Sequence, residues 1–289
     1  MKRILAIASV AVLLAGCNAA QEPRVMARYV PERADDFIFE NNLICGRVYG
    51  QALEAETTSP GIDIWVKRPG ALVADQRYKD ELENGKSYHK DWGNGKDCYK
   101  VGKSLGGGAS AVVIENRLQY PATNYRSWKI LEQSADKVVF CLTYPEWNAD
   151  CETISLSKTF TVTADSYFVK VEDVYTFSGD YGDELEVVAG VFRHLDQETI
   201  QSELEAKDRY AIWEKASDQS AEPEDGMLGV AVYVPGAEGE RLSHGEDHGI
   251  VGRTVKSGET FTYYFGSCWS KGDIKDSAQW FELVNSLSY

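Results

Sequence analysis

The sequence has few basic residues for its number of acids, and this deficit excludes one class of partner. Thirty Lys and Arg residues stand against 45 Asp and Glu, so the 289-residue chain has a formal net charge of −15 at pH 7. Nucleic acid binding needs a basic surface, and the composition therefore argues against a nucleic acid partner. Because the overall field repels anions, an anionic ligand would need a local group of cations to hold it.

Motifs for metals and nucleotides are also missing. The six cysteines include no Cys-x-x-Cys pair. His244 and His248 lie four residues apart, but the glycines and acids around them favour a loop over a metal-binding helix. The triple glycine at residues 106–108 lacks the Lys-Ser/Thr step and the following helix that a phosphate cradle requires. We therefore expect neither a metal site nor an organic cofactor.

The apolar run near the N-terminus is too short to span a bilayer and is typical of a signal peptide. It covers residues 4–14 and follows Met-Lys-Arg. The next block, Leu14-Ala-Gly-Cys17, resembles a bacterial lipobox, and the resemblance implies cleavage before Cys17 and lipidation of that cysteine. An ordinary secretory signal cut at Ala19-Ala20 is the alternative. Firm anchoring would need more than one acyl chain on Cys17.

These features divide the chain into three parts. Residues 1–16 are expected to be a lipoprotein signal peptide, residues 17–30 a tether, and residues 31–289 a single domain. The tether would hold an exported protein in the periplasm or at the outer-membrane surface, with its oligomeric state left open. Exported proteins can form disulfides, and Cys141 and Cys151 flank a plausible hairpin turn that such a bond could bridge.

Beyond the signal, the pattern is that of β-strands. Apolar and polar residues alternate over residues 61–67, 137–144 and 167–177, and β-branched and aromatic residues fill these runs. Further strands are expected at residues 37–49, 111–114, 154–163, 185–192, 228–234 and 261–265. Evenly spaced strands without intervening helices indicate an all-β sandwich or barrel.

Two segments have helical patterns. Residues 72–82 carry few apolar positions, so their pattern is weak. Residues 273–287 form a better helix, because Asp273 or Asp276 can cap it and its apolar residues fall on one face. The expected face consists of Ile274, Trp280, Leu283, Val284 and Leu287.

One stretch fits neither a strand nor a helix, and it is the first candidate for a functional site. Residues 87–108 combine six glycines with aromatic residues, lysines next to acids, and His89. Glycines allow positive φ and a close approach of the backbone to a ligand. Histidine is the side chain that exchanges protons near neutral pH. Long glycine-rich loops in compact domains are usually functional.

Four stretches occur in an order that points to a family: residues 31–37 (PERADDF), 47–50 (RVYG), 61–68 (GIDIWVKR) and 88–108. Together they resemble an uncharacterised-domain family of exported bacterial lipoproteins from polysaccharide-utilisation gene clusters. One branch of that family includes a dehydratase of ulvan oligosaccharides. The resemblance implies a β-supersandwich similar to galactose mutarotase-like folds and to several polysaccharide lyases. It also implies a carbohydrate ligand, but one fold hosts many activities.

Elimination from a uronic acid needs a base at C5, an acid for the oxygen that leaves C4, and a group that neutralises the carboxylate. We expect His89 as the base and Tyr88 or Tyr99 as a further acid or base, with His194 as a second catalytic candidate. The expected carboxylate-binding cations are Arg68, Lys100, Lys103 and Arg193. Aromatic faces for a sugar ring are offered by Trp92, Tyr99 and Trp269.

Each candidate has a structural alternative. His89 could cap a turn, Arg68 could be a solvated edge charge, and Trp269 could cover the core beneath the C-terminal helix. The hypothesis is an exported enzyme without an organic cofactor that eliminates from an acidic oligosaccharide, as a dehydratase or a lyase. A non-catalytic glycan-binding surface lipoprotein and a mutarotase-like sugar epimerase are the alternatives.

Overall fold

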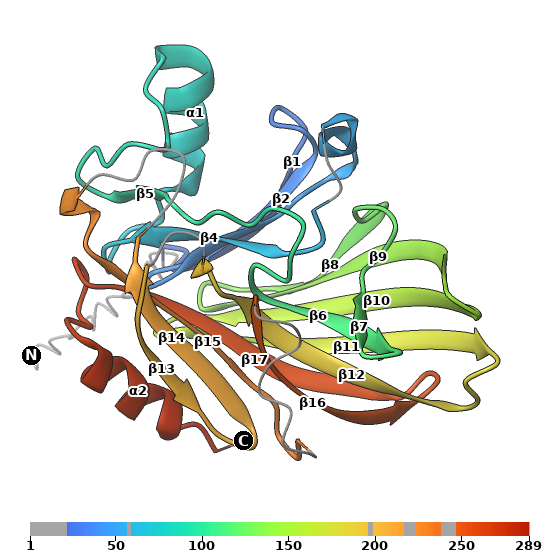
Figure 1. Cartoon of the computed structure of the whole chain (residues 1–289). Helices are drawn as coiled ribbons and strands as arrows, with labels where there is room; N and C mark the ends of the chain where they lie inside the picture. Colours follow the sequence, from blue (N-terminus) through green and yellow to red (C-terminus); the bar gives the residue numbers. More distant parts are fainter. Residues whose placement is uncertain (1–21, 57–58, 196–198, 217–222, 238–246, 289) are drawn as a thin grey trace, which may run out of the picture.

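The fold is an all-β sandwich with two helices on its outside (Figure 1). The computed structural model describes residues 22–56, 59–195, 199–216, 223–237 and 247–288. The expected signal peptide, the start of the tether, Cys17 and His244 lie outside these residues. Val25–Val30, which falls within the tether expected over residues 17–30, forms the first strand, so the domain begins before residue 31.

Three sheets, whose paired strands are all antiparallel, build the sandwich. The five-stranded sheet has the order β1 (Val25–Val30), β2 (Asp36–Asn41), β3 (Cys45–Val48), β4 (Ile62–Lys67), β5 (Gly95–Asp97). The four-stranded sheet has the order β16 (His248–Lys256), β12 (Glu184–Phe192), β6 (Gly107–Ile114), β7 (Arg117–Gln119). The eight-stranded sheet has the order β13 (Ile200–Glu205), β14 (Arg209–Lys215), β15 (Met227–Tyr233), β17 (Thr260–Trp269), β11 (Phe168–Gly179), β10 (Glu152–Thr163), β9 (Lys137–Ala149), β8 (Ser127–Gln133).

Aromatic side chains join the five-stranded sheet to the eight-stranded sheet. Phe39 of β2 lies 6.0 Å from Phe140, 5.8 Å from Phe160 and 5.9 Å from Phe265, measured between ring centroids. Along β10 every second residue is buried, as the alternating pattern predicts. One continuous apolar core therefore runs between the sheets.

The run expected as one strand over residues 37–49 is two strands. β2 and β3 pair as a hairpin, because the Asn41 side chain accepts hydrogen bonds from the backbone N–H groups of Leu43 and Ile44, both at 2.7 Å. An Asn side chain that bonds to the backbone two residues on is a turn former. The hairpin brings Arg47 of β3 next to Asp63 of β4 in register.

Both expected helices are present. The C-terminal helix α2 (Ser277–Asn285) is capped by Asp276, whose carboxylate accepts from Gln279 N at 2.9 Å. Its Trp280 stacks on Phe168 of the eight-stranded sheet at 5.6 Å. Helix α1 (Ala74–Asn84) begins where the buried Glu40 carboxylate accepts from Ala74 N at 2.9 Å, a favourable position for a negative charge.

The expected disulfide does not form. Cys141 lies within β9 opposite Thr159, whereas Cys151 lies in the turn that joins β9 to β10. Eight strand residues separate Cys141 from the end of β9, roughly 26 Å at the usual rise per residue. Disulfide geometry needs Cα atoms within about 7 Å, so the two thiols are too far apart.

The triple glycine packs against the protein itself rather than against a ligand. Gly106 has φ +58°, and a Cβ at this position would collide with the Ile62 backbone. A Cβ at Gly108 would collide with the Phe265 side chain. These glycines allow β6 to approach β4 and β17 closely.

Candidate functional site

A cavity of about 290 Å³, which we call the histidine cavity, collects polar side chains at one end of the five-stranded sheet. Its walls come from the turn after β1, from β3 and β5, from the short helix η1 (Gln51–Ala55) and from the segment after β5. The lining residues are Arg33, Arg47, Tyr49, Leu53, Glu56, Ser59, His89, Asp97, Tyr99, Lys100, Val101 and Gly102.

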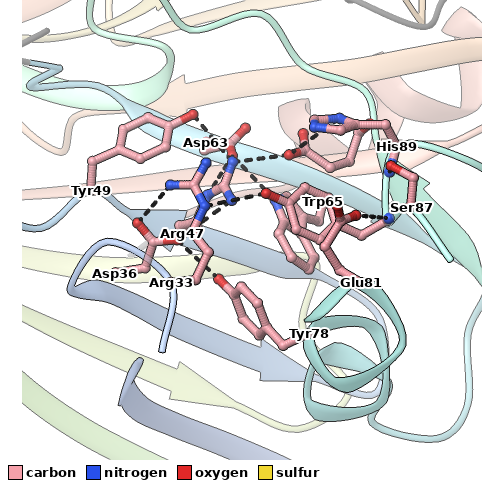
Figure 2. A network of polar contacts seen from close by, with 12 residues as sticks. Arg33, Asp36, Arg47, Tyr49, Asp63, Trp65, Tyr78, Glu81, Ser87 and His89 are labelled. Atoms are coloured by element: carbon pink, nitrogen blue, oxygen red, sulfur yellow. Dashed lines mark hydrogen bonds and ion pairs between the residues drawn. The ribbon is translucent and has the colours of Figure 1, made fainter. Parts of the chain in front are cut away.

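The buried guanidinium of Arg47 forms the floor of this cavity (Figure 2). It donates from Nε to Asp63 Oδ2 at 2.8 Å and from Nη2 to Asp97 Oδ2 at 2.9 Å. A third carboxylate, Asp36, lies 3.5 Å from Nη1. The aromatic ring of Trp65 packs 5.0 Å beneath the guanidinium. Four strands, β2 to β5, are thereby tied together through one side chain.

The charges of this cluster depend on one another. Burial by itself lowers the pKa of Arg47, but Asp63, Tyr49, Asp97 and Asp36 raise it by more, so the pKa lies well above its usual range. Burial raises the pKa of Asp36, and Arg47 opposes this shift. Arg47 therefore stays charged because it is surrounded by acids, and the acids tolerate burial because of Arg47.

Above this floor lie a second guanidinium and a phenol. Arg33 donates from Nη1 to Asp36 Oδ1 at 3.2 Å and from Nε to the Tyr88 hydroxyl at 3.2 Å, and its side chain is 22% exposed. The partly buried Tyr49 accepts a hydrogen bond from Arg47 Nη2 at 3.4 Å. Burial, followed by the charge of Asp63, raises the pKa of Tyr49 well above its usual range. Tyr49 therefore keeps its proton at neutral pH.

His89 reaches the same cavity from the loop between α1 and β5, with 30% of its side chain exposed. Its Nδ1 lies 3.3 Å from the Asp97 carbonyl oxygen and 3.7 Å from Asp97 Oδ2. Both are acceptors, so the proton of a neutral imidazole belongs on Nδ1 and the lone pair on Nε2. The Asp97 carbonyl oxygen therefore orients the imidazole, while the Asp97 carboxylate lies beyond hydrogen-bond distance and contributes through its charge.

Several backbone contacts fix the loop that carries His89. The Tyr88 N–H donates to Glu81 of α1 at 2.9 Å, and the His89 N–H donates to Ser87 Oγ at 3.2 Å (Figure 2). Further along, Asp91 accepts from the N–H groups of Gly93 and Gly95, both at 2.9 Å. Burial raises the pKa of Asp91, but Arg68 and these N–H groups lower it by more.

The structure brings some of the expected site residues together. His89, Tyr99 and Lys100 line the histidine cavity, and Tyr88 lies behind it in contact with Arg33. The pKa of Tyr99 is raised well above its usual range by burial and then by Glu214, so Tyr99 does not act as a base. Tyr88 is buried against Trp65 at 4.9 Å and acts through Arg33.

The burial of His194 contradicts the prediction that it is a catalytic residue. Its side chain is fully buried, with Nδ1 3.0 Å from Glu214 Oε2 and Nε2 2.7 Å from the Lys100 carbonyl oxygen. A histidine enclosed in this way cannot touch a substrate. It supports the backbone of Lys100 instead and is a positioning residue.

Three further candidates lie outside the cavity lining. Arg68 forms a two-fold ion pair with Asp91 at 2.9 and 3.1 Å and stacks 4.8 Å above the Trp269 ring. Trp269 is buried and donates to the Asp225 carbonyl oxygen at 2.7 Å, so it covers the core and cannot stack a sugar. Trp92 is 52% exposed, but its indole packs beside Lys90 on the outside of the loop.

The two remaining cations, Lys103 and Arg193, line a neighbouring cavity of about 450 Å³, which we call the lysine cavity. Lys100, Val101 and Gly102 line both cavities, so this short segment is the wall between them. The candidate cations therefore divide into two places instead of surrounding one ligand group.

Sequence reasoning missed Arg33, Arg47 and Tyr49. All three lie within stretches that carry the family resemblance, residues 31–37 and 47–50. Asp63, which pairs with Arg47, lies within a third such stretch, residues 61–68. The family resemblance therefore pointed to these residues, because the four stretches that carry it supply the cavity and the side chains beneath it.

Among the residues that the structure describes, no helix is long and apolar enough to cross a membrane. In the same residues no group of three or more His, Cys, Asp or Glu is arranged to hold a metal ion. His248 is buried in β16 and accepts from Leu105 N at 3.1 Å, contrary to an exposed loop.

Comparisons with known proteins give one related sequence and several distant folds. The chain is 28% identical over 276 residues to "Uncharacterized protein P7" of Formosa agariphila. This alignment covers 91% of this chain and 66% of that protein. A protein described as a kojibiose phosphorylase from the human microbiome matches at TM-score 0.48 and 12% identity, over 92% of this chain and 35% of that chain. The galactosidase domain of an α-galactosidase-sucrose kinase matches at TM-score 0.37 and 9% identity, over 84% of this chain and 42% of that chain.

At these identities and TM-scores the solved structures carry no argument about activity. The family model is more informative, because it matches residues 15–288 and so covers the cavity and all four stretches. The chain therefore belongs to the family described as "Domain of unknown function (DUF4861)".

Proposed function

We propose that this protein is a carbohydrate-active enzyme that acts on uronate-containing oligosaccharides by β-elimination in the histidine cavity. One observation carries the proposal: the His89–Asp97 pair opens into the same cavity as the Arg33 guanidinium and the Tyr49 phenol. A binding module needs aromatic and polar contacts, but it has no use for an oriented base beside a protonated phenol.

The three chemical requirements of elimination each find a group. Arg33 and Lys100 carry the positive charge that pairs with the sugar carboxylate and makes the C5 proton more acidic. His89 Nε2 takes that proton. Tyr49, whose hydroxyl belongs to the same cavity lining, donates its proton to the oxygen that leaves C4. Asp36 and Asp63 pair with Arg47 and do not line the cavity, whereas Asp97 lines it beside His89.

The step balances without a further reactant. The C5–H bond breaks, its electron pair forms the C4–C5 double bond, and the C4–O bond breaks. The proton from C5 ends on His89 and the proton from Tyr49 ends on the leaving oxygen. The leaving group is water in a dehydratase and a sugar hydroxyl in a lyase. His89 and Tyr49 return to their starting states by exchange with solvent.

The test is an assay of the mature protein with oligogalacturonates, oligomannuronates and oligoglucuronates of two to four residues. We expect the ultraviolet absorbance of a 4,5-unsaturated uronate to grow with at least one of them. Tyr49→Phe should lower kcat by about 10²-fold or more, because the general acid is removed and the ring is kept.

Tyr181→Phe is the matched control, since this exposed hydroxyl contacts Glu115 and lines neither cavity. A sugar that binds but never gives the unsaturated product would reject elimination in favour of binding alone. Absence of binding by every sugar of the panel would reject the acidic-sugar proposal itself.

We also propose that the protein is exported and anchored through lipid on Cys17, on the basis of the Leu14-Ala-Gly-Cys17 sequence. Cells that express the full chain should incorporate labelled palmitate into it and retain it in the membrane fraction. Cys17→Ser should abolish both labelling and retention, because no thiol then remains at the acylation position. Equal labelling of Cys17→Ser and the unchanged chain would contradict the anchor.

A further inference from the structure

The lysine cavity lies beside the proposed catalytic cavity and is larger, at about 450 Å³ against about 290 Å³. Its lining combines cations with apolar surface: Lys100, Val101, Gly102, Lys103, Ser104, Phe192, Arg193, Leu195 and Asp247. The elimination mechanism uses none of these groups except Lys100. The proposed reaction therefore does not account for the other side chains that line the lysine cavity.

The lysine cavity carries three positive charges, Lys100, Lys103 and Arg193, which differ in their described partners. Among the residues that the structure describes, no carboxylate pairs with the ammonium group of Lys100 or of Lys103. Arg193 is different, because Glu203 holds it at 2.8 and 3.0 Å. Asp247 is the acid on the same lining. In a protein of net charge −15, two lysines with no acidic partner among the described residues form the kind of local cation group that an anionic ligand needs.

The same cavity offers an apolar surface to a sugar ring. Phe192 at the end of β12 is partly exposed there, and Leu195 is 41% exposed. The face of an aromatic ring packs well against the C–H face of a sugar, while cations nearby bind its charged substituent.

The wall between the two cavities is fixed in place. His194 holds the Lys100 carbonyl oxygen at 2.7 Å, and Glu214 in turn holds His194. Ser59 Oγ donates to the Gly102 carbonyl oxygen at 2.9 Å, and nothing lies within 4 Å of the place where a Gly102 side chain would begin. The space beside Gly102, which lines both cavities, is therefore open.

We infer that the lysine cavity is a second subsite, which binds the carboxylate of the sugar ring next to the one in the histidine cavity. This inference rests on the proposed function and makes it more specific. It requires a substrate with two neighbouring anionic sugars. Lys100 and Lys103 differ in position. Lys100 lines both cavities, whereas Lys103 lines the lysine cavity but not the histidine cavity.

The test measures affinity by titration calorimetry with galacturonate, digalacturonate and trigalacturonate, and with the corresponding mannuronates and glucuronates. The protein carries His89→Gln so that the sugars stay intact. For the sugar type that binds, we expect the dimer or trimer to bind about 10-fold more tightly than the monomer, as for one added charged hydrogen bond. A neutral trisaccharide, maltotriose, should show no such gain.

Lys103→Met in the same background should remove the 10-fold gain and leave the monomer affinity within about two-fold. Lys129→Met, which removes an exposed lysine of β8 far from both linings, should keep the gain. Equal affinity for monomer, dimer and trimer, or a gain that survives Lys103→Met, would overturn the second subsite while the proposed function stands. If no sugar of any length binds, the proposed function itself fails.

Discussion

Arg47→Met is expected to lower the free energy of unfolding by about 3–5 kcal/mol, because it leaves buried carboxylates without their shared cation. Asp36, Asp63 and Asp97 all lie within 3.5 Å of this guanidinium, and all three are buried. Methionine fills much of the same volume, so the loss reports charge more than packing. Urea unfolding of the two proteins at pH 7, with equal slopes, measures it.

The loss of unfolding free energy caused by Arg47→Met should become smaller as the pH falls from 7 to 5. Burial raises the pKa of Asp36 and Arg47 opposes this rise, so the loss of Arg47 leaves the folded-state pKa of Asp36 further above its unfolded value. The folded variant then binds more protons than the unfolded chain, so its stability rises as the pH falls. Arg117→Met is the control, because this exposed arginine pairs with Glu115 and Asp150 at the surface. It should cost less than about 1 kcal/mol, and so small a loss for Arg47→Met would contradict the role of the cluster.

His89→Gln is expected to lower kcat for elimination by about 10²–10⁴-fold, the usual contribution of a general base. Glutamine can keep a hydrogen bond toward Asp97, but it cannot take the C5 proton. Because His89 is 30% exposed at the cavity mouth, its replacement should leave unfolding by urea nearly unchanged. Oligouronate affinity should stay within a few-fold, since Arg33 and Lys100 remain. A variant that keeps more than half of its kcat would show that another group removes the proton.

The strands could be predicted because their evidence is local. Alternation over residues 154–163 and 167–177 is a property of neighbouring side chains, and β10 and β11 follow it closely. The break within residues 37–49 was harder to see, because it depends on the hydrogen bonds of a single side chain, Asn41. The start of α1 depends on Glu40 of another element, so its boundary could not be located from residues 72–82 alone.

The site could be predicted only in part. His89 stood out because histidine is rare in this chain and lies among glycines. In the sequence His194 is a catalytic candidate and Trp269 a sugar-stacking candidate, but Glu214 encloses His194 and the Asp225 carbonyl oxygen accepts from Trp269, and both partners are distant along the chain. Arg47 could not be predicted as a site residue, because it lies in a short strand and the three acids that converge on it come from other strands.

The most direct test of the central claim is a crystal structure of His89→Gln with the oligouronate that binds most tightly. We expect one sugar carboxylate within hydrogen-bond distance of Arg33, the C5 atom of that ring facing residue 89, and the C4 oxygen facing the Tyr49 hydroxyl. An oligouronate bound outside the histidine cavity, or inside it with C5 turned away from residue 89, would contradict the account.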